Sequence, residues 1–212
     1  MAQSRPVAPE LAAIKVHGMT RESFLLRSTL AGAAAYGTLS ATGLITKALA
    51  ASAGGDVDIL NYALTLEYLE TEFYVQAAKQ VKGLSGYERR LTRELRDNEA
   101  EHVDALVATI KQLGGKPVAQ PMFDFGGAFG NRTTYLKTAN TLEDTGVSAY
   151  NGAAPMIASA EVLGAAGAIV QVEARHAAMI RLVRNRPPAP SAFDKASEMD
   201  AVLAAVKPFI AA

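Results

Sequence analysis

A Glu-x-x-His pattern occurs twice in this chain, at Glu99–His102 and at Glu173–His176. Each copy lies in a segment whose apolar residues recur at the spacing of a helix. Residues three positions apart share one face of a helix, so each copy can present a carboxylate and an imidazole to one point in space. The repeated pattern therefore predicts two helices that each carry half of a metal site.

Two single glutamates complete the pattern. Glu67 precedes Glu99 by 32 residues, and Glu143 precedes Glu173 by 30. Helical bundles that hold two iron or two manganese ions use one Glu from each of two helices and a Glu-x-x-His from each of the other two. The same order of residue types here predicts two similar helical hairpins, related by a shift of about 75 residues.

A bound metal would offset the cost of burying these side chains. A single Glu-x-x-His on a charged helix is usually part of a solvated face, but His102 and His176 are the only histidines after residue 53 and both occupy the pattern. Four buried glutamates without a cation would not all stay ionised. We predict two metal ions per chain, iron or manganese with zinc as an alternative. The predicted ligands are Glu67, Glu99, His102, Glu143, Glu173 and His176.

Four neighbouring residues are candidates to support these ligands. Tyr74 and Tyr150 each follow a single glutamate by seven residues, about two helical turns along the same face. Either tyrosine could hydrogen-bond a ligand, pass electrons, or donate to a backbone carbonyl. Glu70 shares a face with Glu67 and is either a surface residue or a partner of a ligand. Asp144 is either an exposed charge or a group that orients an imidazole.

Composition bounds the class of protein. The chain has 212 residues, half of them hydrophobic, which suits one domain with a sizeable core. It has no cysteine, which excludes disulfides, zinc-thiolate sites, iron–sulfur clusters and thiol nucleophiles. Residues 1–53 hold five of the 21 basic and two of the 21 acidic residues, which leaves 16 basic against 19 acidic in residues 54–212. This net charge of −3 speaks against a nucleic-acid partner.

The first 53 residues differ from the rest. Residues 1–27 are polar and basic, and residues 28–53 are small and weakly apolar, as in an export signal with a cleavage site. Thr20–Leu25 resembles the bacterial twin-arginine signal, but Glu22 stands where the second arginine belongs. We predict export to the bacterial periplasm or beyond, or a cytoplasmic protein if the segment is not a working signal. The alternatives are an N-terminal helix on the bundle or an anchor, although the stretch is too polar for a stable span.

The remaining pattern predicts an all-α protein: a four-helix bundle over residues 54–212 with a long crossover and a short C-terminal helix. Gly54 and Gly55 are expected to break the chain, with Asp56 or Asp58 as the cap of the first helix. The irregular residues 114–132 predict a crossover between the second and third helices. The expected helices span residues 56–81, 87–113, 133 to about 152, 160–184 and 198–210. Phe123, Phe125 and Phe129 are expected to pin the crossover to the bundle.

These motifs resemble those of the ferritin-like superfamily, in particular the ferritin-like domain family that includes bacterial secreted proteins and plant desiccation-related proteins. The likeness runs from about Asp56 to Ala212 and rests on Asn61–Glu70, Leu142–Val147 and the two Glu-x-x-His motifs. The resemblance implies that Glu67, Glu99 and His102 hold one side of a di-metal centre, and Glu143, Glu173 and His176 the other. It also implies that Glu99 and Glu173 bridge the metals.

The chemistry of such a centre favours an oxidoreductase. A reduced di-iron or di-manganese pair would react with a small oxidant, dioxygen or hydrogen peroxide, as a ferroxidase, peroxidase or catalase-like protein in oxidative or desiccation stress. The alternative is a metal-binding, storage or structural stress-protective protein without turnover. Storage in a cage would require a homo-oligomer, and no residue pattern identifies the interfaces.

Overall fold

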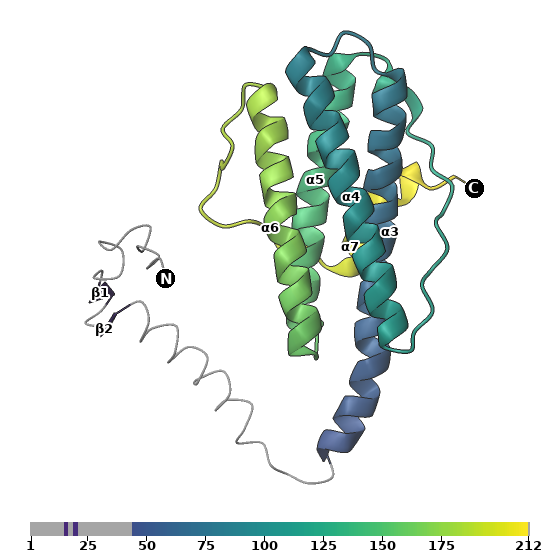
Figure 1. Cartoon of the computed structure of the whole chain (residues 1–212), viewed down its shortest axis with the longest axis vertical. Helices are drawn as coiled ribbons and strands as arrows, with labels where there is room; N and C mark the ends of the chain where they lie inside the picture. Colours follow the sequence, from purple (N-terminus) through teal and green to yellow (C-terminus); the bar gives the residue numbers. More distant parts are fainter. Residues whose placement is uncertain (1–14, 17–18, 21–43, 212) are drawn as a thin grey trace, which may run out of the picture. The chain divides into compact units, whose positions relative to one another are not determined.

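The computed structural model describes residues 15–16, 19–20 and 44–211. Four long helices and one short one make up most of this part of the chain (Figure 1): α3 (Leu44–Gln80), α4 (Gly86–Gln112), α5 (Arg132–Ala153), α6 (Ala160–Val183) and α7 (Met199–Val206). Single 3-10 turns lie at Gly126–Phe129, Ala154–Met156 and Lys207–Phe209. The predicted all-α bundle with a short C-terminal helix is confirmed.

Residues 1–48 form a unit apart from residues 49–212 in the division of the chain, and only a few of them are described. In it, β1 (Lys15–Val16) pairs antiparallel with β2 (Met19–Thr20). The predicted export signal lies largely outside the described residues. Among the helices that the structure describes, none is both long enough and apolar enough to cross a membrane.

Polar contacts fix the directions of the four long helices. At one end, Arg132 at the start of α5 donates from Nε to Glu88 at the start of α4, at 2.7 Å. At the other end, Asp56 of α3 accepts hydrogen bonds from the backbone of Ala158 and Ser159, just before α6. Since α4 and α5 begin at the same end, the chain between them runs the length of the bundle (Figure 1). This confirms the predicted crossover.

Local sequence explains where the helices begin. Ser85 and Glu88 form a reciprocal capping box at the start of α4, and the side chain of Asn131 accepts from two backbone N–H groups at the start of α5. Ser159 caps α6 through Val162. Each cap satisfies backbone donors that the first turn of a helix leaves without partners.

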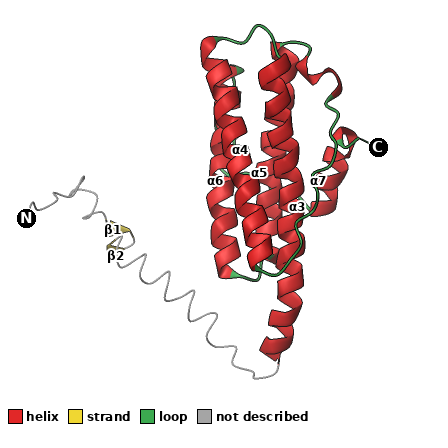
Figure 2. Cartoon of the chain, turned by 45° about the vertical axis from the view of Figure 1, so that its right-hand side comes forward, coloured by secondary structure: helices red, strands yellow, loops and turns green. Residues whose placement is uncertain are grey.

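The crossover is pinned by aromatic packing, as the sequence predicts. The rings of Phe125 and Phe129 both lie 5.2 Å from the ring of Phe73 on α3, centroid to centroid. The C-terminal segment covers the crossover, because Ile210 forms an antiparallel bridge with Phe123. Figure 2 shows the crossover and α7 on the same side of the bundle.

The apolar core forms two clusters. One contains the large side chains Phe73, Leu95, Phe125, Tyr135 and Leu136 toward the starts of α4 and α5, and it extends along α3 and α5 as far as Ile59 and Ala153. The other lies toward the opposite end and contains Leu60, Leu64, Leu106, Ile110 and Val162. Most of the buried acidic residues lie on helix turns between these two sets, so a polar layer is enclosed by apolar packing on both sides.

One prediction about the first helix is wrong. Helix α3 continues through Gly54 and Gly55 from Leu44, so the two glycines do not end or begin a helix. Glycine lowers the stability of a helix interior by only about 1 kcal/mol per residue, which is too little to force a break. Asp56 therefore does not cap α3; its buried carboxylate instead accepts two hydrogen bonds, both 2.8 Å, from the segment before α6.

Replacing Asp56 by Ala should lower the free energy of unfolding by about 2 kcal/mol, because two part-buried backbone N–H groups lose a charged acceptor. The matched control is Asp58→Ala, which removes an exposed carboxylate from the same helix. Urea unfolding of both variants measures the difference. Equal stability of the two variants would contradict this role for Asp56.

Candidate metal centre

All four long helices contribute side chains to one buried cluster. Glu67 lies on α3 and Glu143 on α5, while α4 and α6 carry the two Glu-x-x-His pairs. The four glutamates and His176 have no exposed surface, and His102 is 9% exposed. The structure therefore brings together all six side chains that the sequence singles out: Glu67, Glu99, His102, Glu143, Glu173 and His176.

The six side chains form two overlapping groups. In each group, one donor atom per residue lies within 4.8 Å of the others; the first group is Glu67, Glu99, His102 and Glu173, and the second is Glu99, Glu143, Glu173 and His176. Glu99 and Glu173 belong to both groups. Each can therefore face two ions at once, and each comes from a different Glu-x-x-His motif.

Both imidazoles point Nδ1 into the cluster. The Nδ1 atom of His102 lies 3.2 Å from Glu67, 3.0 Å from Glu99 and 3.0 Å from Glu173, measured to a carboxylate oxygen of each. A single N–H can serve only one of these acceptors well. The Nδ1 atom of His176 lies 2.8 Å from Glu99 and 3.5 Å from Glu143. Several carboxylate oxygens thus converge on each ring nitrogen.

Many of these close atoms lack an aligned hydrogen-bond partner. They include both oxygens of Glu173, Oε1 of Glu99, Oε2 of Glu143 and Nδ1 of His176, although some lie within 3 Å of a neighbour. Buried polar atoms without partners are costly, and a cation coordinated by carboxylates and imidazoles removes that cost. The donor types and their convergence fit a pair of metal ions.

Burial and mutual contacts shift the pKa values of the cluster. Burial raises the pKa of Glu67 to about 7, and it raises the pKa of Glu173 well above 4.5, with the charges of Glu99 and Glu67 as additional causes. Burial also raises the pKa of Glu143. Burial opposes ionisation of Glu99 too, but hydrogen bonds from His102 and His176 outweigh it and lower the pKa of Glu99 to about 2.

The two imidazoles shift the other way. Burial favours their neutral forms, yet hydrogen bonds to the surrounding glutamates outweigh it and raise the pKa of His102 to about 12 and that of His176 to about 11. Without a metal, the cluster therefore keeps both imidazoles protonated to offset part of the carboxylate charge. A metal must displace these protons in order to bind.

The two tyrosines connect the hairpins. Tyr74 of α3 donates its hydroxyl hydrogen bond to Glu143 of α5, and Tyr150 of α5 donates to Glu67 of α3 at 2.5 Å. Burial and the neighbouring carboxylates raise the pKa of both phenols well above 10.0, so both stay protonated donors. Each tyrosine thereby fixes the single glutamate of the other hairpin.

The remaining candidates differ in position. Glu70 is buried beside the cluster, with 2% of its surface exposed. Asp144 lies elsewhere: its carboxylate pairs with Arg181 and accepts a hydrogen bond from Asn140 at 2.8 Å, at the protein surface. Of the two roles considered for Asp144, this position favours the exposed charge over the group that orients an imidazole, because a residue adjacent to Glu143 on a helix points about 100° away from it.

The sequence did not single out Asn98. Its side-chain amide lies 3.0 Å from Nε2 of His176 and so holds the ring with Nδ1 toward the carboxylates. Such contacts to the outer nitrogen orient a metal-binding imidazole. The signal was available, because Asn98 precedes His102 by four residues and lies on the same face of α4.

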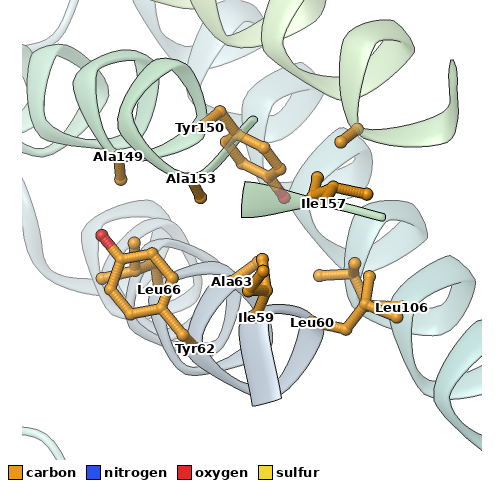
Figure 3. A pocket seen from close by; sticks show the side chains of 11 residues that line it. Ile59, Leu60, Tyr62, Ala63, Leu66, Leu106, Ala149, Tyr150, Ala153 and Ile157 are labelled. Atoms are coloured by element: carbon orange, nitrogen blue, oxygen red, sulfur yellow. The ribbon is translucent and has the colours of Figure 1, made fainter. Parts of the chain in front are cut away.

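A small apolar cavity adjoins the cluster. It has a volume of about 20 Å³ and is lined mainly by apolar side chains of all four long helices and by Tyr150, whose hydroxyl reaches Glu67. Figure 3 shows Tyr150, Ala149 and Ala153 facing Ile59, Ala63 and Leu66 across it. The cavity has room for one molecule about the size of water, but an apolar lining disfavours water there.

The bundle and its buried carboxylates define a ferritin-like four-helix protein with a site consistent with two metal ions. The Ferritin-like domain family matches residues 55–186, and the chain belongs to this family. No curated protein sequence matches the chain significantly.

Two solved structures share the fold. A bacterioferritin-related protein from Bacteroides fragilis, described as a dodecameric thioferritin, aligns with 21% identity and a TM-score of 0.57 over 63% of this chain and 86% of that one. A conserved hypothetical protein from Mycobacterium tuberculosis aligns with 15% identity and a TM-score of 0.53 over 66% of this chain and 97% of that one. At these identities the likeness shows the fold alone.

In metal-free protein, the free energy of unfolding should fall as the pH rises from about 5 to about 8. The pKa of Glu67 is about 7 in the folded protein against 4.5 when unfolded, so its contribution is complete below pH 4.5 and is lost as the pH rises through 7. His102 and His176, whose pKa values rise from 6.5 to about 12 and about 11, act in the same direction above pH 6.5.

Urea unfolding with a chelator at several pH values measures this slope. Because metal ions displace the same protons, the increase in Tm caused by added Mn²⁺ should grow over the same pH range. A metal-free protein that becomes more stable toward pH 8 would contradict the assignment.

Proposed function

We propose that this protein binds two iron or manganese ions in the buried cluster, and that the reduced centre reacts with dioxygen or hydrogen peroxide. The observation that carries the proposal is the pair of overlapping ligand groups that share Glu99 and Glu173. The geometry supports Glu67 and His102 as ligands of one ion and Glu143 and His176 as ligands of the other.

The charge and donor types favour these metals. Four ionised glutamates balance two divalent cations when both imidazoles are neutral. Carboxylate and imidazole donors suit iron and manganese, and zinc remains an alternative that cannot change oxidation state. When bound, a pair of iron or manganese ions supplies two electrons to an oxidant.

The chain's own residues would hold the ligands and limit access. Tyr74 and Tyr150 keep their protons and fix Glu143 and Glu67 through hydrogen bonds. Asn98 fixes the ring of His176. Because the ligands are buried, only a small reactant could reach them, and His102 is the one ligand with exposed surface. These features support a small oxidant over an organic substrate.

The apolar cavity beside Tyr150 favours dioxygen over hydrogen peroxide as the molecule that binds next to the centre. An apolar lining accommodates apolar dioxygen better than the polar peroxide. Ala153→Val should fill part of the cavity and slow the reaction of the reduced centre with dioxygen several-fold, while metal content stays the same. The matched control is Ala105→Val on the exposed face of α4. Stopped-flow absorption measures both rates. Equal rates in the two variants would remove the cavity from the oxidant's path.

The reaction itself is tested by titrating the reduced, metal-loaded protein with hydrogen peroxide without oxygen. Each peroxide accepts two electrons, one from each metal ion, and with two protons gives two waters, so the spectral change should end at one peroxide per pair of ions. The double variant Glu99→Ala, Glu173→Ala should lose this change, whereas Glu101→Ala, at an exposed position of α4, should keep it. Metal-loaded protein that shows no change with either oxidant would favour the binding or structural alternative.

Export and assembly are separate proposals. We infer from the composition of residues 1–53 that the protein is exported, which would place it where oxidative or desiccation stress reaches the cell surface. An intact Met1 on periplasmic protein would contradict cleavage of this segment.

The dodecamer formed by the Bacteroides fragilis protein makes assembly of this chain a reasonable proposal. A monomer or dimer by light scattering would oppose bulk iron storage.

A further inference from the structure

Glu70 is a fifth buried glutamate that the two ligand groups do not include. It lies on α3 one helical turn after Glu67, and only 2% of its surface is exposed. Its Oε1 atom has no hydrogen-bond partner. A buried carboxylate oxygen without a partner is costly and calls for a specific reason to be there.

Gly146 on α5 makes the room that Glu70 occupies. A Cβ atom at Gly146 would lie 3.2 Å from Oε1 of Glu70 and 3.5 Å from Oε2 of Glu173. The carboxylates of Glu70 and Glu173 therefore meet at the same point beside the α5 backbone. Glycine is unfavourable in the interior of a helix, so its presence in the middle of α5 fits a requirement for this space.

The internal repeat shows that this arrangement is asymmetric. Glu67 and Glu143, Glu70 and Gly146, and Tyr74 and Tyr150 are pairs with the same separation of 76 residues. The first hairpin thus carries a carboxylate where the second carries no side chain. Of these two equivalent positions, only the one on α3 contributes a carboxylate beside Glu173.

The surroundings of Glu70 turn it toward the cluster. The gap between α3 and α5 that Glu70 and Gly146 line is filled by apolar side chains, among them Leu69, Leu142 and Val206 of α7, and has no room for a water molecule. Burial raises the pKa of Glu70 well above 4.5, and the next causes are the charges of Glu173 and Glu143. Geometry gives the side on which Glu70 enters: the space at Gly146 lies one helical turn after Glu143 on α5 and borders Glu173. Glu173 belongs to both ligand groups, whereas Glu143 belongs only to the group that contains His176.

We propose that Glu70 is an additional carboxylate ligand of the metal centre, on the side held by Glu143, Glu173 and His176, and that Gly146 is the position that admits it. The inference rests on the proposed di-metal centre. It makes the two metal positions unequal, because the ion beside His176 gains a protein ligand that the ion beside His102 lacks. The position beside His102 is then the more open one, and it adjoins both the exposed edge of His102 and the cavity next to Tyr150.

The test is a Mn²⁺ titration of full-length protein followed by electron paramagnetic resonance, with Glu70→Gln as the variant. We expect the wild type to bind two ions of unequal affinity, and Glu70→Gln to bind the tighter one 10- to 100-fold more weakly. Glu101→Gln removes an exposed carboxylate and is the matched control. Gly146→Ala should also weaken the tighter ion, because its new methyl group would press on Oε1 of Glu70.

Circular dichroism and thermal unfolding of the metal-free proteins separate loss of a ligand from loss of the fold. A folded Glu70→Gln variant with the affinities and spectrum of the wild type would overturn the role of Glu70 and leave the proposed function intact. A wild type that binds no Mn²⁺ or Fe²⁺ in this experiment would overturn both.

Discussion

The cost of burying carboxylates is the constraint on which this structure depends. Each ionised glutamate removed from water costs several kcal/mol unless it is paired or coordinated, and this bundle encloses Glu67, Glu99, Glu143 and Glu173 completely. Apolar clusters on both sides of the carboxylate layer exclude water and leave the glutamates dependent on one another, on the imidazoles and on a cation. The site is therefore part of the core of the protein, and a metal bound there would couple its binding to folding.

The site depends on contacts between the two hairpins, because each hairpin positions a glutamate of the other. Tyr74 of the first hairpin holds Glu143 of the second, and Tyr150 of the second holds Glu67 of the first. The hairpins differ at the positions that surround the ligands. The second hairpin has Gly146 at the position equivalent to Glu70, and Val172 at the position equivalent to Asn98. Both differences add protein contacts on the side of His176, which is fully buried, while His102 keeps a small exposed edge.

Much of this arrangement could be predicted from the sequence, because helical spacing decides which residues share a face. The two Glu-x-x-His motifs and the two single glutamates carry enough periodicity to predict four helices and one buried cluster. The same rule also distinguishes two neighbours of the ligands. Glu70 is three residues from Glu67 and shares its face, whereas Asp144 adjoins Glu143 and therefore points to the surface.

Other features depend on contacts that no local pattern encodes. Helix α3 continues through Gly54 and Gly55 because the cost of two glycines in its interior is small compared with the stability of the rest of this long helix. The bonds from Asp56 to the segment before α6, and from Asn98 to His176, join residues that lie far apart in the chain. The space at Gly146 becomes meaningful only once α3 and α5 are packed together.

The most direct test of the account is a crystal structure of the Mn²⁺-loaded protein with anomalous scattering measured at the manganese edge. Two peaks should appear inside the bundle, roughly 3.5–4 Å apart as in two-metal sites. One peak should contact Glu67 and His102, the other should contact Glu143 and His176, and Glu99 and Glu173 should lie between them. A single surface peak, or none within the carboxylate layer, would contradict the di-metal centre.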